Sequence, residues 1–189
     1  MWDQPSDPVD PVAVAQVLER LADAPPRCGS VRVVAVDGRS GSGKTTLALA
    51  VAARLGAPVV HMDRLYPGWD GLAASVPILV SEVLVPLAQG VGAAYRVWDW
   101  HHDRWNGREY VAPAPVVVVE GCGSSVGAAG DHAAVRVWME APRAERLRRG
   151  LARDGETYRP HWERWAAQED RLYAVDDTRA KADLVIRTG

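Results

Sequence analysis

Hydrophobic positions along the chain fall into two kinds of stretch that follow each other in turn. Short, mainly apolar stretches predict five strands, at 31–36, 58–62, 116–119, 135–139 and 182–186. Longer stretches with apolar residues three and four apart predict five helices, over 12–21, 44–55, 75–89, 142–153 and 161–175. Strands that alternate with helices predict an α/β fold, in which a mainly parallel five-stranded sheet lies between helical layers as a three-layer sandwich.

A small hairpin is expected outside this main sheet. Its two stretches, 95–98 and 109–111, are short and alternating, and a polar, aromatic segment separates them. We therefore assign 1–189 to a single domain with an insertion at about 91–113. Residues 1–28, which contain the first predicted helix, form an N-terminal extension of this domain.

A phosphate-binding loop is predicted at 38–45, where the sequence GRSGSGKT fits the Walker A pattern G-x-x-x-x-G-K-[ST]. A predicted strand precedes the loop and a predicted helix follows it, which is the context that this site requires. Its glycines let successive backbone N–H groups point inward, Lys44 adds a cation for the outer phosphates, and Thr45 offers a hydroxyl to Mg²⁺. The expected nucleotide-binding residues are Gly38, Ser40, Gly41, Ser42, Gly43, Lys44, Thr45 and Thr46.

Composition narrows the class of protein further. The net charge of −2 gives no indication of binding to nucleic acid or to an anionic membrane. No stretch of about 18 apolar residues is present, and residues 1–8 are acidic and proline-rich, unlike a signal peptide. The two cysteines, Cys28 and Cys122, suggest neither a disulfide framework nor a metal site. We therefore expect a cytoplasmic protein, and the sequence leaves its oligomeric state open, a homo-oligomer included.

Two carboxylates follow predicted strands directly. Asp63 comes after the strand at 58–62, and Glu120 ends the valine-rich strand at 116–119. Because ligands of open parallel sheets bind at the carboxyl ends of the strands, both carboxylates are expected near the phosphate loop. A carboxylate there can orient or deprotonate a hydroxyl, or hold a metal-bound water, although an acidic residue that merely caps the next turn gives the same pattern.

With these motifs, the sequence resembles the uridine kinase-like branch of the P-loop kinases. The resemblance covers about residues 31–187 and rests on the order of its motifs along the chain. These are the loop G-x-S-G-S-G-K-T-T, the D-x-x-Y motif from Asp63 to Tyr66, the pair Glu120-Gly121, the arginine-rich stretch at 146–154 and the closing strand at 182–186. ATP and Mg²⁺ are the cofactors that this resemblance implies.

The resemblance also implies roles for individual residues. Asp63 would be the general base toward the acceptor hydroxyl, Tyr66 would line the acceptor pocket, and Glu120 would support Mg²⁺ together with Thr45. Arginines of a lid at about 146–160 would stabilise the transferring phosphoryl group, and the candidates are Arg149 and Arg153, which share a helical face with Arg146. Asp99 and Trp100, in the aromatic segment of the insertion, are candidate acceptor-binding residues.

These expectations favour an ATP-dependent kinase that phosphorylates a hydroxyl of a small molecule, most simply a nucleoside such as uridine or cytidine. A nucleoside monophosphate, a sugar or a coenzyme precursor remains an alternative acceptor, with Arg64, Arg96 and Arg104 as candidates for binding a second phosphate. A regulatory protein that binds ATP without catalysis is a further alternative. A GTPase is disfavoured because the sequence has no N-K-x-D-like guanine signature.

Overall fold

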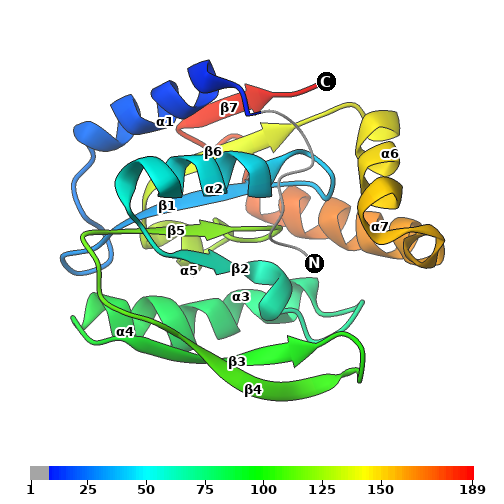
Figure 1. The fold of residues 1–189 in the computed structure, drawn as a ribbon, viewed down its shortest axis with the longest axis horizontal. Coiled ribbons are helices and arrows are strands. Elements are labelled where there is room, and N and C mark those ends of the chain that lie inside the picture. The colour runs from blue at the N-terminus through cyan, green and yellow to red at the C-terminus, as the bar shows by residue number, and fades with distance from the viewer. Residues whose placement is uncertain (1–8) are drawn as a thin grey trace.

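The chain forms a three-layer α/β sandwich around one parallel sheet (Figure 1). The computed structural model describes residues 9–189, so residues 1–8 of the expected N-terminal extension lie outside the described part. The sheet has the strand order β2-β5-β1-β6-β7. Its strands are β1 (Arg32–Gly38), β2 (Val59–His61), β5 (Val116–Glu120), β6 (Ala133–Glu140) and β7 (Leu184–Arg187).

The register of the central strands brings three functional segments to one edge of the sheet. Strand β5 pairs with β1 and β2 on either side, and Glu120 is the partner of both Val36 and His61. The phosphate loop follows β1, and Asp63 follows β2, so both lie beside Glu120. All five residues of β5 are buried, which explains why its valine run carries no alternation of polar and apolar positions.

Helices cover the two faces of the sheet unequally. Helices α1 (Pro11–Ala22) and α2 (Lys44–Leu55) pack on one face, where Val17 and Leu47 meet Val34 and Val118. The other face carries a longer set of segments: α3 (Leu72–Leu79), η2 (Val80–Leu84), α4 (Val85–Ala88), α5 (Ala128–Asp131) and α7 (Arg159–Asp176). Helix α6 (Arg143–Asp154) and the 3₁₀ turn η3 (Glu156–Tyr158) lie beyond the carboxyl end of β6 (Figure 1).

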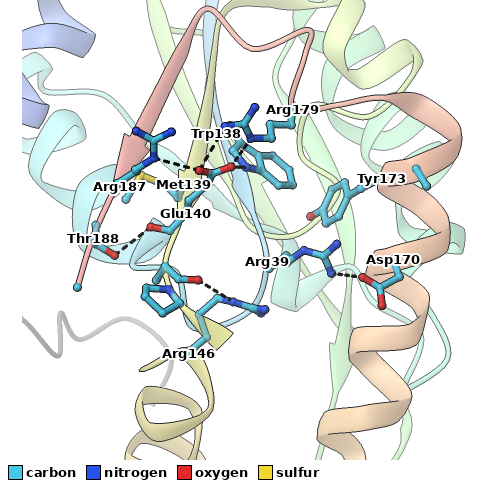
Figure 2. A pocket seen from close by; sticks show the side chains of 14 residues that line it. Arg39, Trp138, Met139, Glu140, Arg146, Asp170, Tyr173, Arg179, Arg187 and Thr188 are labelled. Carbon is cyan, nitrogen blue, oxygen red and sulfur yellow. Dashed lines mark hydrogen bonds and ion pairs between the residues drawn. The ribbon is translucent and has the colours of Figure 1, made fainter. Parts of the chain in front are cut away.

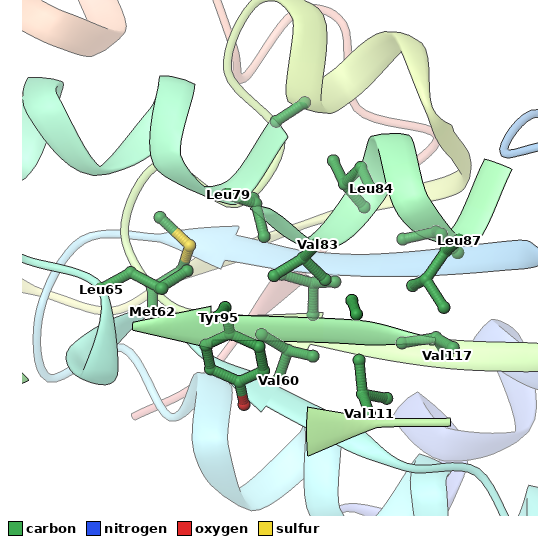
Figure 3. Close-up of a cluster of buried hydrophobic side chains, with 14 of the residues drawn as sticks. Val60, Met62, Leu65, Leu79, Val83, Leu84, Leu87, Tyr95, Val111 and Val117 are labelled. Carbon is green, nitrogen blue, oxygen red and sulfur yellow. The ribbon is translucent and has the colours of Figure 1, made fainter. Parts of the chain in front are cut away.

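The hairpin of β3 (Ala93–Asp99) and β4 (Arg104–Val111) forms a separate antiparallel sheet, as the alternating stretches predict. It joins the core through buried Tyr95 and Val111, which belong to one apolar cluster with Leu84 and Leu87 of the η2–α4 region (Figure 3). Burial of this apolar surface stabilises the attachment of the hairpin to the domain. The expected insertion is therefore packed against the core on one side.

The helix predicted over 75–89 differs most from the structure, because it starts at Leu72 and is interrupted. The N–H of Val85 donates to the carbonyl of Val80, five residues back, in the π-helical segment η2. Pro86 follows directly, and proline can neither donate an N–H nor fit above a regular helical turn, so the wider turn accommodates it. Helix α5 was not predicted because four residues are too few to show helical periodicity.

Helix α7 begins at Arg159, before the predicted limit at 161, with a proline in its first turn, where the missing N–H has no intrahelical partner to lose. Within residues 9–189, no helix combines the length and the apolar character that crossing a bilayer would demand.

Candidate active site

The phosphate loop connects β1 to α2 with the backbone conformation that its glycines allow. Gly38, Gly41 and Gly43 all have positive φ angles, of 137°, 79° and 92°. A Cβ atom on Gly41 would lie 2.3 Å from the carbonyl oxygen of Arg146, so a larger residue there would push the loop away from α6. Gly43 precedes α2, whose first N–H groups therefore point into the loop, as anion binding requires.

Lys44 is buried at the start of α2 among acidic groups. Its Nζ donates to the carbonyl of Arg39, 2.9 Å away, across the loop. Burial opposes its charge, but nearby acidic groups, including Glu120, more than offset this effect, and the pKa of Lys44 is raised. The ammonium therefore keeps its positive charge inside the protein, which suits it to phosphate binding.

Glu120 and Thr45 form the pair of oxygen ligands expected for Mg²⁺. The Thr45 hydroxyl donates to Oε2 of Glu120 at 3.2 Å, and Oε1 of Glu120 lies 2.7 Å from Nδ1 of His61. Among residues 9–189, no cluster of three or more His, Cys, Asp or Glu side chains is placed for a metal. Mg²⁺ commonly uses one or two protein oxygens together with phosphates and waters, so this pair fits the ion.

Asp63 lies in the 3₁₀ turn η1 (Met62–Arg64), directly after β2, and lines the same cavity as Lys44, Thr45 and Glu120. Burial raises the pKa of the Asp63 carboxyl, and the negative charge of Glu120 acts in the same direction, whereas Arg153 opposes both. A carboxylate with a raised pKa is a stronger base than one in water, which suits a group that accepts a proton from a hydroxyl.

The three arginines of α6 that were expected on one lid face have different surroundings. Arg153 lines the cavity with Asp63 and pairs with Asp154 at 2.8 Å. Arg149 lies beside Gly43 and Thr46, outside that cavity, and its Nη1 donates to the Thr188 hydroxyl at 2.9 Å. Arg146 is buried and donates to the carbonyl of Ser40 at 3.2 Å.

The acceptor side of the cavity is walled by aromatic residues. Tyr66 is buried, its hydroxyl donates to the carbonyl of Cys122 at 2.9 Å, and its ring meets that of Trp165 edge to face. Trp100 lines the cavity and its Nε1 donates to the backbone carbonyl of Asp63 at 2.8 Å. The cavity between these walls has a volume of about 40 Å³.

Asp99, the other candidate acceptor-binding residue, does not line this cavity. Its carboxylate accepts hydrogen bonds from the backbone N–H groups of His101 and His102, from the His102 ring and from Asn106, all within the turn of the hairpin. These bonds lower the pKa of Asp99, the bond from the His102 ring most of all. The structure therefore gives Asp99 a role in shaping the β3–β4 turn.

The arginines considered for a second phosphate also lie elsewhere. Arg64 pairs with Glu109 at 3.3 Å, and Arg96, on β3, pairs with Glu82 of η2. Arg104 begins β4 and is exposed. Within residues 9–189, Arg153 is the arginine that lines the cavity around Asp63.

Several residues of the site carry no clear signal in the sequence. Trp69 and Tyr158 line the cavity, and the Tyr158 hydroxyl lies 2.8 Å from Oγ of Ser40. Buried Glu169, on α7, accepts a hydrogen bond from the Ser40 N–H at 2.6 Å. Trp69 lies three residues after Tyr66, so the D-x-x-Y motif could have pointed to it, whereas Tyr158 and Glu169 reach the site only through the tertiary fold.

Comparison with known proteins places the fold. No protein-family model and no curated protein sequence matches the chain. Among solved structures, the chain is similar to a possible uridine kinase from Bacillus stearothermophilus, with a TM-score of 0.68, 18% identity, and coverage of 93% of this chain and 97% of the other. It is also similar to a structure named as a fructose transport system kinase from Silicibacter sp. TM1040, with a TM-score of 0.59, 24% identity and the same coverage. The chain thus has the α/β fold of P-loop kinases.

Proposed function

We propose that this protein is an ATP-dependent kinase that transfers the γ-phosphoryl group of ATP to a hydroxyl of a small molecule. The observation that carries the proposal is the shared cavity of Asp63, Lys44, Thr45, Glu120 and Arg153. A phosphate cradle alone would serve any nucleotide-binding protein. A partly buried carboxylate beside it, directly after a neighbouring strand, is what transfer to a hydroxyl needs in addition.

Each residue has a part in this reaction. Asp63 accepts the proton of the acceptor hydroxyl while the new O–P bond forms and the bond from the γ-phosphorus to ADP breaks. Lys44 and Arg153 stabilise the charge that spreads over the phosphoryl oxygens. Thr45 and Glu120 hold Mg²⁺, which neutralises phosphate charge when it is bound with ATP. Positioning and electrostatics of this kind supply most of the catalysis in phosphoryl transfer.

A nucleoside is our first candidate for the acceptor, because a flat base suits the aromatic wall formed by Tyr66, Trp69, Trp100 and Trp165. A nucleoside monophosphate is less well supported, since Arg64 and Arg96 pair with carboxylates outside the cavity. Fold similarity to kinases with differing names does not discriminate between acceptors.

The proposal is tested by following ATP consumption with Mg²⁺ against a panel of nucleosides, nucleoside monophosphates and sugars. Mass spectrometry should detect a product that is heavier by one phosphoryl group. Lys44→Ala should abolish turnover while circular dichroism shows an unchanged fold, and Asp63→Asn should bind ATP but not transfer phosphate. Undiminished transfer in either variant would contradict the assigned roles.

A further inference from the structure

A second cavity, of about 640 Å³, lies on the outer side of the phosphate loop (Figure 2). We call it the outer groove; it lies between α7 and the ends of β6 and β7, and Arg39 contributes to it from the loop. Its volume is within the range of small-molecule sites, about 300–1,000 Å³. Lys44, Thr45, Asp63 and Glu120 do not line it, so the outer groove is distinct from the candidate active site.

The outer groove carries an excess of positive side chains. Four arginines line it, against two carboxylates, Glu140 and Asp170; the arginines are Arg39, Arg146, Arg179 and Arg187. Arg179 and Arg187 both pair with Glu140, while Arg39 pairs with Asp170 at 2.5 Å on the opposite side. Figure 2 shows the two groups of arginines at different ends of the groove, with Trp138 between them.

These ion pairs are the kind that an incoming anion can replace. The side chains of Arg179 and Arg187 are 53% and 78% exposed, and an exposed ion pair contributes only about 0–1 kcal/mol of stability. A guanidinium group that gives up such a carboxylate can bind a phosphate through two parallel N–H···O bonds. The same arginines can therefore hold Glu140 when the groove is empty and hold a phosphate when it is filled.

The remainder of the lining is apolar and does not suit an inorganic ion alone. Met139, Ala141, Pro142 and Ala174 contribute aliphatic surface, and the rings of Trp138 and Tyr173 meet edge to face beside it. An occupant that buries this surface must carry an apolar part next to its anionic group. A flat ring gains the most from a groove that is bordered by aromatic side chains.

We propose that the outer groove binds a small organic phosphate that carries a flat apolar group, at the same time as ATP occupies the phosphate loop. The bound phosphate would lie against Arg179 and Arg187, and the apolar group would face Met139, Pro142 and Ala174. This second site does not depend on the kinase activity or on the identity of the acceptor.

Arg39 connects this site to the nucleotide. Its guanidinium lines the outer groove, while its backbone carbonyl accepts the hydrogen bond from Lys44 at 2.9 Å. A ligand that fills the groove packs against the Arg39 side chain and so shifts the residue that holds Lys44. Occupancy of the groove should therefore change the affinity for ATP a few-fold, and ATP should change the affinity of the groove by the same factor.

Isothermal titration calorimetry with phenyl phosphate as the probe tests the proposal on the full chain. Phenyl phosphate should bind in the outer groove, and phenol and inorganic phosphate should each bind there at least about tenfold more weakly, because each lacks one of the two required parts. Equal binding of inorganic phosphate would overturn the need for an apolar group, and absence of phenyl phosphate binding would overturn the site.

Two kinds of variant locate the binding. The double variant Arg179→Gln/Arg187→Gln should weaken phenyl phosphate binding by at least about tenfold. Arg20→Gln, which removes an ion-paired arginine outside the groove with an exposure near that of Arg179 (47% against 53%), is the matched control and should change nothing. Ala174→Trp, which fills the groove without altering its charge, should also abolish binding. Unchanged binding in the double variant or in Ala174→Trp would overturn the assignment.

The titration is then repeated with saturating ATP. A few-fold change in the dissociation constant of phenyl phosphate, without its displacement, is the expected result. Complete displacement would show that the probe occupies the nucleotide site and would overturn a separate site. An unchanged constant would overturn the connection through Arg39.

Discussion

The hydroxyl of Tyr158 lies 2.8 Å from Oγ of Ser40, so the segment that follows α6 contacts the phosphate loop directly. Ser40 is held from two more directions, since its N–H donates to Glu169 and its carbonyl accepts from Arg146. All four side chains are buried. The conformation of the phosphate loop therefore depends on residues more than a hundred positions away in the chain.

Removal of the bond between Tyr158 and Ser40 should loosen this attachment. Tyr158→Phe and Ser40→Ala should each lower the free energy of unfolding by about 0.5–1.5 kcal/mol, as expected for one buried hydrogen bond. Because both variants remove the same bond, the double variant should lose little more than either single one in urea unfolding. Tyr110→Phe, at an exposed tyrosine of the hairpin, is the control. Strictly additive losses would contradict a shared bond.

Asp63→Asn should separate stability from activity. Burial raises the pKa of Asp63 in the folded protein, so ionisation of this carboxyl opposes folding. Below the ordinary aspartate pKa, about 3.9, the carboxyl is protonated in both the folded and the unfolded state and does not oppose folding. As pH rises through the raised pKa of the folded state, the wild type loses that stability. The variant should therefore be more stable than the wild type at pH 7, and the difference should vanish near pH 3, while activity falls at least about a hundredfold.

Urea unfolding of both proteins across this pH range is the measurement. Asp23→Asn, at an exposed carboxylate after α1, serves as the control, with no comparable gain expected at neutral pH. If the variant were less stable than the wild type at pH 7, the claim that ionised Asp63 destabilises the folded state would be wrong.

Glu120→Gln should raise the Mg²⁺ concentration required for half-maximal turnover by about tenfold or more, because a neutral amide is a weaker ligand for Mg²⁺ than a carboxylate. Gln can still accept the hydrogen bond from Thr45, so the fold should be retained. The assay is turnover against Mg²⁺ at fixed ATP, with Glu163→Gln, an exposed position on α7, as the control. An unshifted Mg²⁺ dependence would remove Glu120 from the metal site.

The aromatic wall and the hairpin turn should respond differently to substitution. Trp69 lines the cavity and stacks on His161 with ring centroids 4.2 Å apart, so Trp69→Ala should raise the KM for the acceptor by about tenfold or more. Asp99→Ala should leave this KM within about twofold and lower only the stability of the hairpin turn, because four donors lose their acceptor. A large KM effect of Asp99→Ala would return Asp99 to the acceptor site.

Asp37 should be among the residues on which the stability of the site depends most. Its buried carboxylate accepts from the N–H groups of Gly38, Gly123 and Ser125 and from the Tyr173 hydroxyl. Asp37→Ala leaves these donors buried without this acceptor, at a cost of about 1–3 kcal/mol for each unsatisfied group. We expect a loss of at least about 3 kcal/mol in urea unfolding, against little change for the exposed Asp131→Ala.

The strands and the phosphate loop are predictable from local sequence because their requirements are local. A continuous apolar run such as 116–119 suits few environments other than a buried parallel strand, and β5 extends it by one residue. The glycine pattern of the loop encodes its own backbone conformation. The approach of Asp63 to Glu120 also follows, since strand ends of one parallel sheet share an edge.

The acceptor side is not predictable in the same way. Whether Asp99 faces a ligand or its own turn depends on donors that become available only when the hairpin closes, and four such donors surround it. Arg146, Arg149 and Arg153, spaced three and four apart on one helical face, have three different environments, because α6 is contacted on several sides. Pro86 predicts an irregular helix, but it does not predict the π-helical turn that accommodates the proline.

The narrowness of the cavity at Asp63 bears on the fate of ATP. A volume of about 40 Å³ exceeds the roughly 10–15 Å³ that one water needs, but it is far below the volume of ordinary small-molecule sites, about 300 Å³ or more. Trp69, Trp100 and Trp165 line the cavity, so they should separate to admit an acceptor and pack against it once it is bound. Closure around the acceptor, rather than in its absence, would then exclude water and limit hydrolysis of ATP, the chief competing reaction for any enzyme that activates a hydroxyl.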